Sequence, residues 1–268
     1  MDTSTTLPVN LDSYLRRLPF LDPRHHEEAA TRPIKDAVNI PLAELDQRIH
    51  ELPPPHEIIE IAADAELAHQ SQTKLATHKR QSRIVPFEHA EATRGRLWEP
   101  NALILEQAAR QHPGKALDLG CGTGRDAIYL ASGGWKVWAV DHLPDALERG
   151  RLTATRLLEQ HADRIEWRPE DIEEATEPDE QFDLVSAFFF MSPKVLAYAI
   201  KAVKPGGWLL IESFTPTHRE ARGKPKDPSP TLNTEEASKK LQSFEITQAG
   251  EGWRADRHTL RLIAQKRL

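Results

Sequence analysis

Residues Ala116 to Asp126 read Ala-Leu-Asp-Leu-Gly-Cys-Gly-Thr-Gly-Arg-Asp, a short apolar run that leads into three closely spaced glycines. Glycine permits sharp turns at positive φ, and because it has no Cβ it lets a ligand approach the main chain. An apolar strand, such a loop and a following helix are typical of nucleotide-type binding sites. The stretch therefore predicts a strand-loop-helix unit with a ligand resting on the loop.

Charge around this loop indicates which ligand it takes. A dinucleotide fingerprint would be Gly-x-Gly-x-x-Gly, but Arg125 stands at the third glycine position, and Asp118 comes two residues before the first glycine. A carboxylate there repels a phosphate and attracts a cation. The pattern favours S-adenosylmethionine, which carries an ammonium group and a sulfonium and has no phosphate.

The loop also resembles motif I of the class I S-adenosylmethionine-dependent methyltransferases. Its Gly-Thr-Gly-Arg-Asp ending is most similar to the small-molecule branch that includes the tellurite-resistance methyltransferases. The resemblance covers about residues 94–268 and implies an α/β domain there, doubly wound and Rossmann-like, with a seven-stranded, mostly parallel sheet. Ten residues are predicted to bind the cofactor: Asp118, Gly120, Cys121, Gly122, Gly124, Asp141, His142, Asp171, Ile172 and Phe188.

Four of these predictions, for Asp141, His142, Asp171 and Ile172, rest on landmarks beyond the loop. The apolar run 136–140 predicts a strand that ends in Asp141, roughly twenty residues after the loop, where a carboxylate can accept both ribose hydroxyls. His142 follows it, either against the adenine edge or facing solvent. The family resemblance implies that Asp171 binds the adenine amino group and that Ile172 lies against the ring. Cys121, a small loop residue, is expected to face the methionine portion rather than to act as a nucleophile.

The remaining apolar runs predict the rest of the sheet. Strands are expected over 164–168, 182–190, 208–213, 244–249 and 258–266, with a helix over 193–203 and a Lys-Pro-Gly-Gly turn at 204–207. Strands that alternate with helices predict a doubly wound, largely parallel sheet.

The segment after the fourth strand bears on the methyl acceptor. It reads Phe188-Phe189-Phe190-Met191-Ser192-Pro193, where amide and adenine N-methyltransferases carry Asn/Asp-Pro-Pro-Tyr. This apolar wall suits a small, soft or hydrophobic acceptor such as a thiol, a chalcogen anion or a halide. The alternative is that these phenylalanines belong to the core. No catalytic residue is assigned, and a non-catalytic S-adenosylmethionine-binding regulatory protein remains the second hypothesis.

The first 93 residues carry a different pattern. Asp22-Pro23-Arg24 and the segment 34–42, Ile-Lys-Asp-Ala-Val-Asn-Ile-Pro-Leu, resemble a rhodanese domain over about residues 12–88, with strands expected over 14–21 and 57–61 and a helix around 45–52. The loop where a rhodanese has its cysteine reads Ala62-Ala63-Asp64-Ala65. Because the thiolate is the nucleophile, this domain (1–93) is expected to be inactive and to serve as a scaffold, a protein-partner contact or a lid. An appended structural domain is the plainer alternative.

Composition excludes several classes. At 268 residues the chain is expected to form two modules with a break near residue 93. The net charge of −6 argues against strong nucleic-acid binding, and no apolar run is long enough for a membrane span. A single cysteine precludes an intrachain disulfide and favours a cytoplasmic location. His25 and His26 lack partners at a metal-ligand spacing, and Trp98 is the candidate lid residue.

Overall fold

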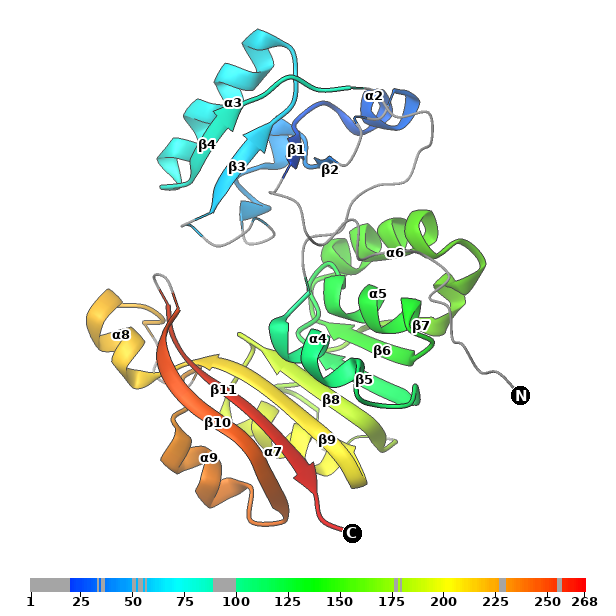
Figure 1. Ribbon diagram of the computed structural model, residues 1–268, viewed down its shortest axis with the longest axis vertical. Helices are drawn as coiled ribbons and strands as arrows, with labels where there is room; N and C mark the ends of the chain where they lie inside the picture. Colours follow the sequence, from blue (N-terminus) through cyan, green and yellow to red (C-terminus); the bar gives the residue numbers. More distant parts are fainter. Residues whose placement is uncertain are drawn as a thin grey trace. The chain divides into compact units, whose positions relative to one another are not determined.

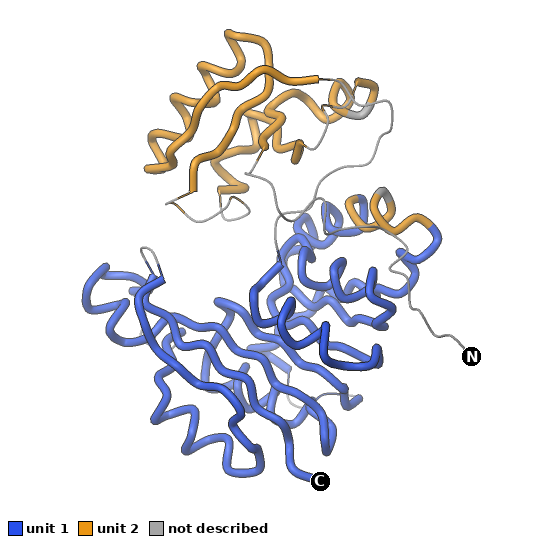
Figure 2. Tube along the Cα trace, in the orientation of Figure 1, with its two compact units in different colours: residues 1–8, 100–152, 160–268 blue, residues 9–99, 153–159 orange. Residues whose placement is uncertain are grey.

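The computed structural model describes residues 20–32, 34, 37–49, 52, 55, 57–88, 100–175, 178, 180–226, 230–254 and 257–268. The chain divides into two compact units, shown in different colours in Figure 2. Unit 1 comprises residues 1–8, 100–152 and 160–268, and unit 2 comprises residues 9–99 and 153–159. The break predicted near residue 93 lies outside the described residues, as does Trp98.

Unit 2 contains a small parallel sheet. Its four strands pair in the order β2-β1-β3-β4, each parallel to its neighbour. Buried aliphatic side chains, including Leu21, Ile59 and Ile61, form its core. The elements of this unit are β1 (Phe20–Asp22), α2 (His26–Thr31), β2 (Val38–Asn39), the 3-10 helix η1 (Leu42–Glu44), β3 (Ile58–Ile61), α3 (Ala65–Thr77) and β4 (Gln81–Ile84).

The α-helix predicted around 45–52 is wrong. The described residues here form the 3-10 helix η1, turns over residues 45–48 and a 3-10 conformation at Ile49. The backbone bonds there are mostly of the short type, with Leu45 N–H donating to Leu42 O and Gln47 N–H to Glu44 O. Proline follows the segment directly in the sequence, and the residue before a proline is disfavoured in the helical conformation, which works against a helix that reaches residue 52.

Unit 1 contains the seven-stranded sheet that the sequence predicts. Its strands pair in the order β10-β11-β9-β8-β5-β6-β7, and β11 alone among these seven runs opposite to the rest, antiparallel to both β9 and β10 (Figure 1). The strands are β5 (Lys115–Leu119), β6 (Lys136–Asp141), β7 (Ile165–Pro169), β8 (Phe182–Phe188), β9 (Val203–Phe214), β10 (Phe244–Arg254) and β11 (Arg257–Lys266). The helices are α4 (Ala102–Ala108), α5 (Arg125–Ser132), α6 (Pro144–Leu158), the 3-10 helix η3 (Glu159–Arg164), α7 (Pro193–Ala202), α8 (Pro216–Arg222) and α9 (Thr234–Lys240).

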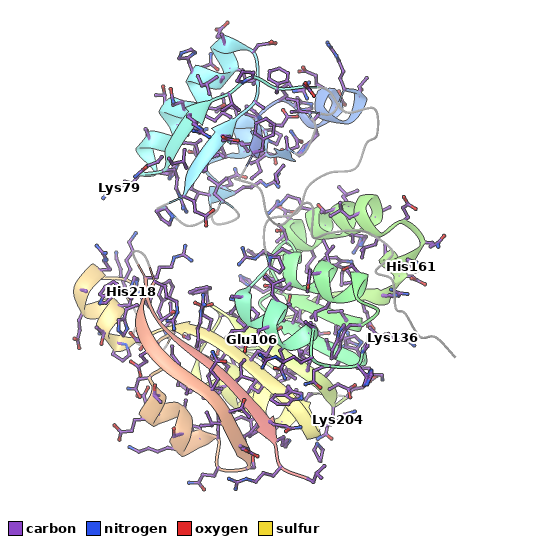
Figure 3. All side chains as sticks on the ribbon, viewed as in Figure 1. Lys79, Glu106, Lys136, His161, Lys204 and His218 are labelled. Atoms are coloured by element: carbon purple, nitrogen blue, oxygen red, sulfur yellow. The ribbon has the colours of Figure 1, made fainter. Side chains whose placement is uncertain are left out.

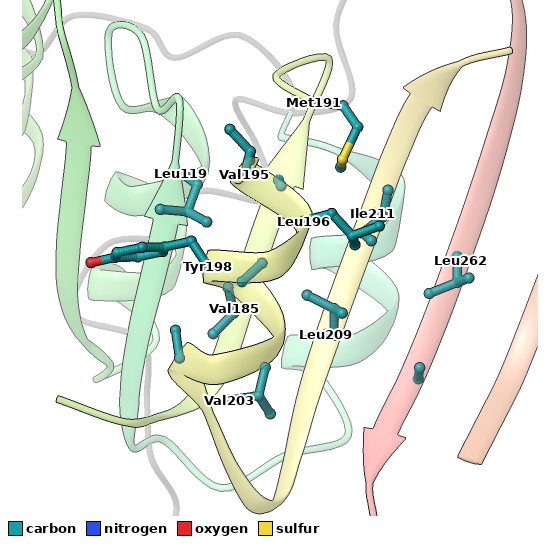
Figure 4. Packing of buried hydrophobic residues seen from close by; sticks show 14 of the residues in the cluster. Leu119, Val185, Met191, Val195, Leu196, Tyr198, Val203, Leu209, Ile211 and Leu262 are labelled. Atoms are coloured by element: carbon teal, nitrogen blue, oxygen red, sulfur yellow. The ribbon is translucent and has the colours of Figure 1, made fainter. Parts of the chain in front are cut away.

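Side-chain alternation explains how this sheet divides its two faces. Successive residues of a strand point to opposite faces, so Leu209 and Ile211 of β9 pack with Val195 and Leu196 of α7 in one cluster (Figure 4). Leu210 and Glu212, which alternate with these two residues along β9, point to the other face and are also buried. The central strands therefore read as continuous apolar runs because both faces are covered.

One predicted turn is part of a strand instead. Strand β9 begins at Val203, which pairs with Phe182 of β8, so the Lys-Pro-Gly-Gly segment lies within it. A register shift between Phe182 and Leu184 and a positive φ of 77° at Gly206 accommodate the bend. The sequence placed the strand start at Trp208 because proline and glycine normally interrupt strands.

The sheet brings the candidate ligand residues to one edge. Strands β5, β6, β7, β8 and β9 are parallel, so their carboxyl ends meet at this edge, called the carboxyl edge below. Strand β11 runs antiparallel to β9 and pairs Thr259 with Phe214, which brings the connection between β10 and β11 to the same edge. Ligands of open α/β sheets bind at the carboxyl ends of the strands.

Candidate functional site

The glycine loop connects β5 to α5 at the carboxyl edge. Gly120, Gly122 and Gly124 have φ of 68°, 56° and 74°, in the left-handed region that favours glycine. The N–H groups of Gly120 and Cys121 both donate to Val140 O, at 2.9 and 3.0 Å, which fastens the loop to β6.

The three glycines differ in what surrounds them. A Cβ on Gly120 would lie 2.5 Å from Phe190, and one on Gly124 would overlap the ring of Trp167. A Cβ on Gly122 would meet no atom of the described residues within 4 Å. Two of the glycines are therefore required by protein packing, whereas Gly122 borders open space that a ligand can fill.

Asp118 lies before this loop and is buried, with 2% of its surface exposed. One carboxylate oxygen accepts a hydrogen bond from Ser186 Oγ at 2.9 Å, while Oδ2 has no hydrogen-bond partner among the described residues. Burial is the main cause that raises the pKa of Asp118 well above its ordinary value, and the negative charge of Asp126 adds to it. A buried oxygen without a donor is costly unless a ligand supplies one, and the ammonium group of S-adenosylmethionine fits this need.

Asp141 ends β6 and links the strand to the loop. Its Oδ2 accepts the Gly122 N–H at 2.8 Å, and its Oδ1 accepts the Leu143 N–H at 3.0 Å. His142 Nδ1 lies 3.5 Å from Asp141 Oδ1, and the His142 side chain is 57% exposed. The structure therefore brings Asp118, Gly122 and Asp141 to one short stretch of the carboxyl edge.

The other predicted contacts lie in different surroundings. Cys121 is half-buried, and burial together with the charges of Asp118 and Asp141 raises the pKa of its thiol well above the usual value, so the reactive thiolate is disfavoured. Asp171 is exposed and accepts the Glu173 N–H, whereas Ile172 packs within the core cluster. Phe188 is half-buried at the end of β8. Cofactor contacts by these residues stay predictions.

A buried polar network beside the site escaped the sequence analysis. Glu212 of β9 accepts hydrogen bonds from Asn101 Nδ2 at 2.8 Å, Thr259 Oγ1 at 3.1 Å and Arg261 Nε at 3.0 Å. The Asn101 N–H donates to Asp126 Oδ1 at 2.7 Å. Burial raises the pKa of Asp126, and the charge of Glu212 adds to this. The one signal was a glutamate inside an apolar strand, since a buried charge needs partners from elsewhere in the fold.

Aromatic side chains continue the site beyond the loop. Phe190 packs on Gly120, and Phe189 beside it has a φ of 56°, which is unusual for a bulky residue. The Phe189 N–H donates to Glu212 O at 2.7 Å. The ring of Phe189 lies 5.1 Å from that of Phe214 at the end of β9. The apolar segment after β8 thus lies against the cofactor loop.

The motif residues of unit 2 form a structural network. Arg24 is 4% exposed and donates to both oxygens of Asp22, from Nε at 2.9 Å and from Nη2 at 2.8 Å. The hydrogen bond to Asp22 raises the pKa of Arg24. Asn39 Nδ2 donates to the carbonyl oxygens of Asp22 and Arg24. The two segments that suggested a rhodanese domain therefore hold each other in place.

Metal and membrane sites were searched in the part of the chain that the structure describes. That part holds no group of three His, Cys, Asp or Glu side chains arranged to bind a metal ion. Its helices are all too short or too polar to cross a membrane.

Comparisons with known proteins bear on the second half of the chain. Residues 116–207 match the protein family described as Methyltransferase domain. Hemagglutinin 1 of Eikenella corrodens is 34% identical over 125 residues, covering 44% of this chain and 40% of that protein. The release factor glutamine methyltransferase of Koribacter versatilis (strain Ellin345) is 39% identical over 84 residues, covering 31% of this chain and 29% of that protein. The chain spans less than half the length of either relative.

Solved structures share the fold of unit 1. TehB from Haemophilus influenzae superposes with a TM-score of 0.53 at 22% identity, over 63% of each chain. The N-methyltransferase NodS from Bradyrhizobium japonicum WM9, solved with S-adenosyl-L-homocysteine, gives a TM-score of 0.50 at 18% identity, over 61% of this chain and 84% of that chain.

The fold, the glycine loop and the family match together define the class of unit 1. It has the fold of solved S-adenosylmethionine-dependent methyltransferases, with a mostly parallel seven-stranded sheet, and its residues 116–207 match the methyltransferase domain family. The predictions of a methyltransferase and of its cofactor are confirmed at this level.

Proposed function

We propose that this protein transfers the methyl group of S-adenosylmethionine to a small-molecule acceptor, such as a thiol or a chalcogen oxyanion. The observation that carries the proposal is buried Asp118, whose Oδ2 has no hydrogen-bond partner among the described residues, at the start of a loop in which Gly122 borders open space. Together they provide a negative group for an ammonium and a bare backbone surface for the rest of a ligand.

The cofactor supplies an electrophilic methyl group, and the residues of the chain bind and orient it. Asp118 takes the amino group, the backbone at Gly122 borders the methionine portion, and Asp141 accepts the ribose hydroxyls. Aligning the acceptor with the methyl group and excluding water are the tasks left to the protein. The remaining cofactor contacts follow the family resemblance: Gly120, Cys121 and Gly124 in the loop, His142, Asp171 and Ile172 around the adenine, and Phe188 at the end of β8.

The acceptor assignment rests on the segment after β8. Phe190 packs on Gly120 and Phe189 packs near Phe214, so the wall beside the loop is aromatic, and the sequence has no Asn/Asp-Pro-Pro-Tyr clamp there. A glutamine methyltransferase is among the relatives, but only a short region matches it. The net charge of −6 also disfavours an RNA acceptor.

Unit 2 is proposed to be a rhodanese-like domain without sulfurtransferase activity. Its parallel sheet and the buried pair of Arg24 and Asp22 support the likeness, and the loop 62–65 holds no thiol. A thiosulfate and cyanide assay is expected to give no product above background, and clear activity would overturn this part. We assign unit 2 to contacts with a protein partner and the whole chain to the cytoplasm, where Cys121 stays reduced.

The direct test is methyl transfer from labelled S-adenosylmethionine into fractionated cell extract. Label is expected in the small-molecule fraction with the natural protein and not with Asp118→Asn, while Asp183→Asn serves as a control of equal charge change at the other end of the sheet. Label found in protein or in tRNA would overturn the proposed small-molecule acceptor and indicate a macromolecular one. Cofactor binding without label in any fraction would favour a non-catalytic regulatory protein.

A further inference from the structure

A ladder of five rings lies at the carboxyl edge, and we infer that it is the stacking surface for a planar aromatic acceptor that reacts through an ionisable thiol or hydroxyl group. These rings are called the aromatic platform below and belong to Phe189, Phe214, His218, Trp253 and His258. The inference deepens the proposed methyl transfer and rests on it.

The rings of the platform follow one another in steps suited to stacking. Phe189 and Phe214 lie 5.1 Å apart, Phe214 and His218 stack at 4.4 Å with 20° between their planes, and His218 lies 6.2 Å from Trp253. His258 meets Trp253 edge to face at 5.3 Å. Aromatic pairs favour separations in this range, so a further planar ring can extend the ladder.

Hydrogen bonds fix the two imidazoles in this ladder. The backbone N–H of His258 donates to His218 Nδ1 at 3.1 Å, and Thr215 Oγ1 bonds His258 Nδ1 at 2.7 Å. His218 is buried on α8, labelled in Figure 3, and its ring is held between Phe214 and the hairpin of β10 and β11. Trp253, in contrast, is 48% exposed. The ladder is therefore rigid at its base and open at Trp253.

The platform adjoins the cofactor loop through a strained residue. Phe190 packs on Gly120, and Phe189 next to it is held at a φ of 56° while its N–H donates to Glu212 O. A bulky residue in this region is strained, and such strained residues cluster at functional sites. The Phe189 ring lies against that of Phe214 at the carboxyl edge.

Two guanidinium groups make the platform positive. Arg257 lies over the ring of Phe189, with 5.2 Å to the centroid, and Arg222 over that of Trp253, at 5.3 Å. Nearby cations favour the ionised form of a thiol or hydroxyl. In the transfer, the acceptor releases its proton to solvent, its sulfur or oxygen forms a bond to the methyl carbon, and the carbon–sulfonium bond breaks with its electron pair going to the sulfonium sulfur.

The experiment compares thiophenol and phenol with cyclohexanethiol, which resembles thiophenol in size but has no planar ring. Initial rates are measured with S-adenosylmethionine, and the binding of S-adenosylhomocysteine and of thiophenol is measured separately by calorimetry. The natural protein is expected to show a KM for thiophenol roughly tenfold below that for cyclohexanethiol. Thiophenol is also the stronger acid, so the contribution of stacking is the part of this difference that the ring variants remove. If phenol is the better substrate of the two, the stacking role of the platform stands and the nucleophile is oxygen rather than sulfur.

Two variants test the platform itself. Trp253→Leu removes an exposed ring, and Phe189→Gly removes a ring while relieving the positive φ, so both are expected to fold. Each is expected to raise the KM for thiophenol roughly fivefold, with kcat and the affinity for S-adenosylhomocysteine within twofold of the natural protein. Leu152→Ala, at an exposed leucine of α6, is the control and is expected to change neither.

The outcomes separate this inference from the proposed function. Equal KM values for the two thiols, or equal effects of Trp253→Leu on both, would mean that the rings only fasten the hairpin and would overturn the inference. Intact S-adenosylhomocysteine binding without thiophenol binding would overturn it as well, while leaving the cofactor site in place. Loss of cofactor binding by the natural protein would overturn the proposed function and the inference that rests on it.

Discussion

Replacing Asp118 by asparagine tests the cofactor site most directly. The substitution keeps the shape of the side chain and removes the negative charge, and the buried Oδ2 has no hydrogen-bond partner among the described residues. If this oxygen binds the ammonium group of S-adenosylmethionine, the variant loses a charged hydrogen bond. If this oxygen does not bind the ammonium group, the variant should bind S-adenosylmethionine as tightly as the natural protein does.

The size of the effect follows from the burial of Asp118. A hydrogen bond to a charged group contributes about 1.5–3 kcal/mol, and the raised pKa means that part of this is spent on ionising a buried carboxyl. We therefore expect a loss of about 2 kcal/mol, which corresponds to roughly 30-fold weaker binding.

The pH dependence has a definite sign. Burial first, then the charge of Asp126, raises the pKa of Asp118, so the free protein holds this proton well above the ordinary value of 3.8. An ammonium ligand favours the carboxylate, so affinity rises as pH increases from that value through the raised pKa, and binding releases a proton. Folding favours the protonated form of Asp118, because its pKa is higher in the folded than in the unfolded chain. The contribution of Asp118 to the free energy of unfolding is therefore fully present below pH 3.8 and is lost as the pH rises through the raised pKa. Asp118→Asn is expected to remove both dependences.

Titration calorimetry with S-adenosylmethionine in two buffers of different ionisation enthalpy measures affinity and proton release together. Asp183→Asn is the matched control because Asp183 begins β8 at the far end of the sheet and pairs with Lys204. Binding by Asp118→Asn within threefold of the natural protein, or the same loss in Asp183→Asn, would refute the assignment of the ammonium group to Asp118.

Three further substitutions test the rest of the site. Gly122→Ala places a methyl group in open space at a φ of 56°, so we expect the free energy of unfolding to fall by only about 1–2 kcal/mol. The affinity for S-adenosylmethionine, measured by calorimetry, should fall more than tenfold. Gly124→Ala, whose Cβ would meet Trp167, should instead show its main loss in urea unfolding. Asp141→Ala is expected to weaken cofactor binding roughly tenfold, from lost hydrogen bonds to the ribose, and unchanged affinity would contradict that role. Glu212→Gln puts an amide donor among groups that already donate, so the free energy of unfolding should fall by about 2 kcal/mol, and an unchanged urea midpoint would show that the network contributes little.

Local patterns in the sequence were enough to predict most of unit 1. The glycine loop, the carboxylate at the end of β6 and the apolar run of β8 each involve neighbours in the chain, and β-strand periodicity is a local property. The errors arose where local rules compete. A helix was predicted around 45–52 from amphipathic spacing, but short-range turns form there. The proline-glycine segment at 204–207 lies within β9 at a register shift, because Val203 before it and Trp208 after it both pair with β8.

The sequence by itself determined which residues can make a methyl-donor site, because the backbone freedom of Gly122 and the charges of Asp118 and Asp141 are properties of those residues. Only the tertiary structure decided that, within the described part of the chain, Asp118 keeps an oxygen without a partner and Gly122 alone of the three loop glycines borders open space. It also decided that Glu212 joins Asn101, Thr259 and Arg261. The physical reason is that burial and hydrogen-bond satisfaction depend on groups far apart in the chain, which meet only when the sheet assembles.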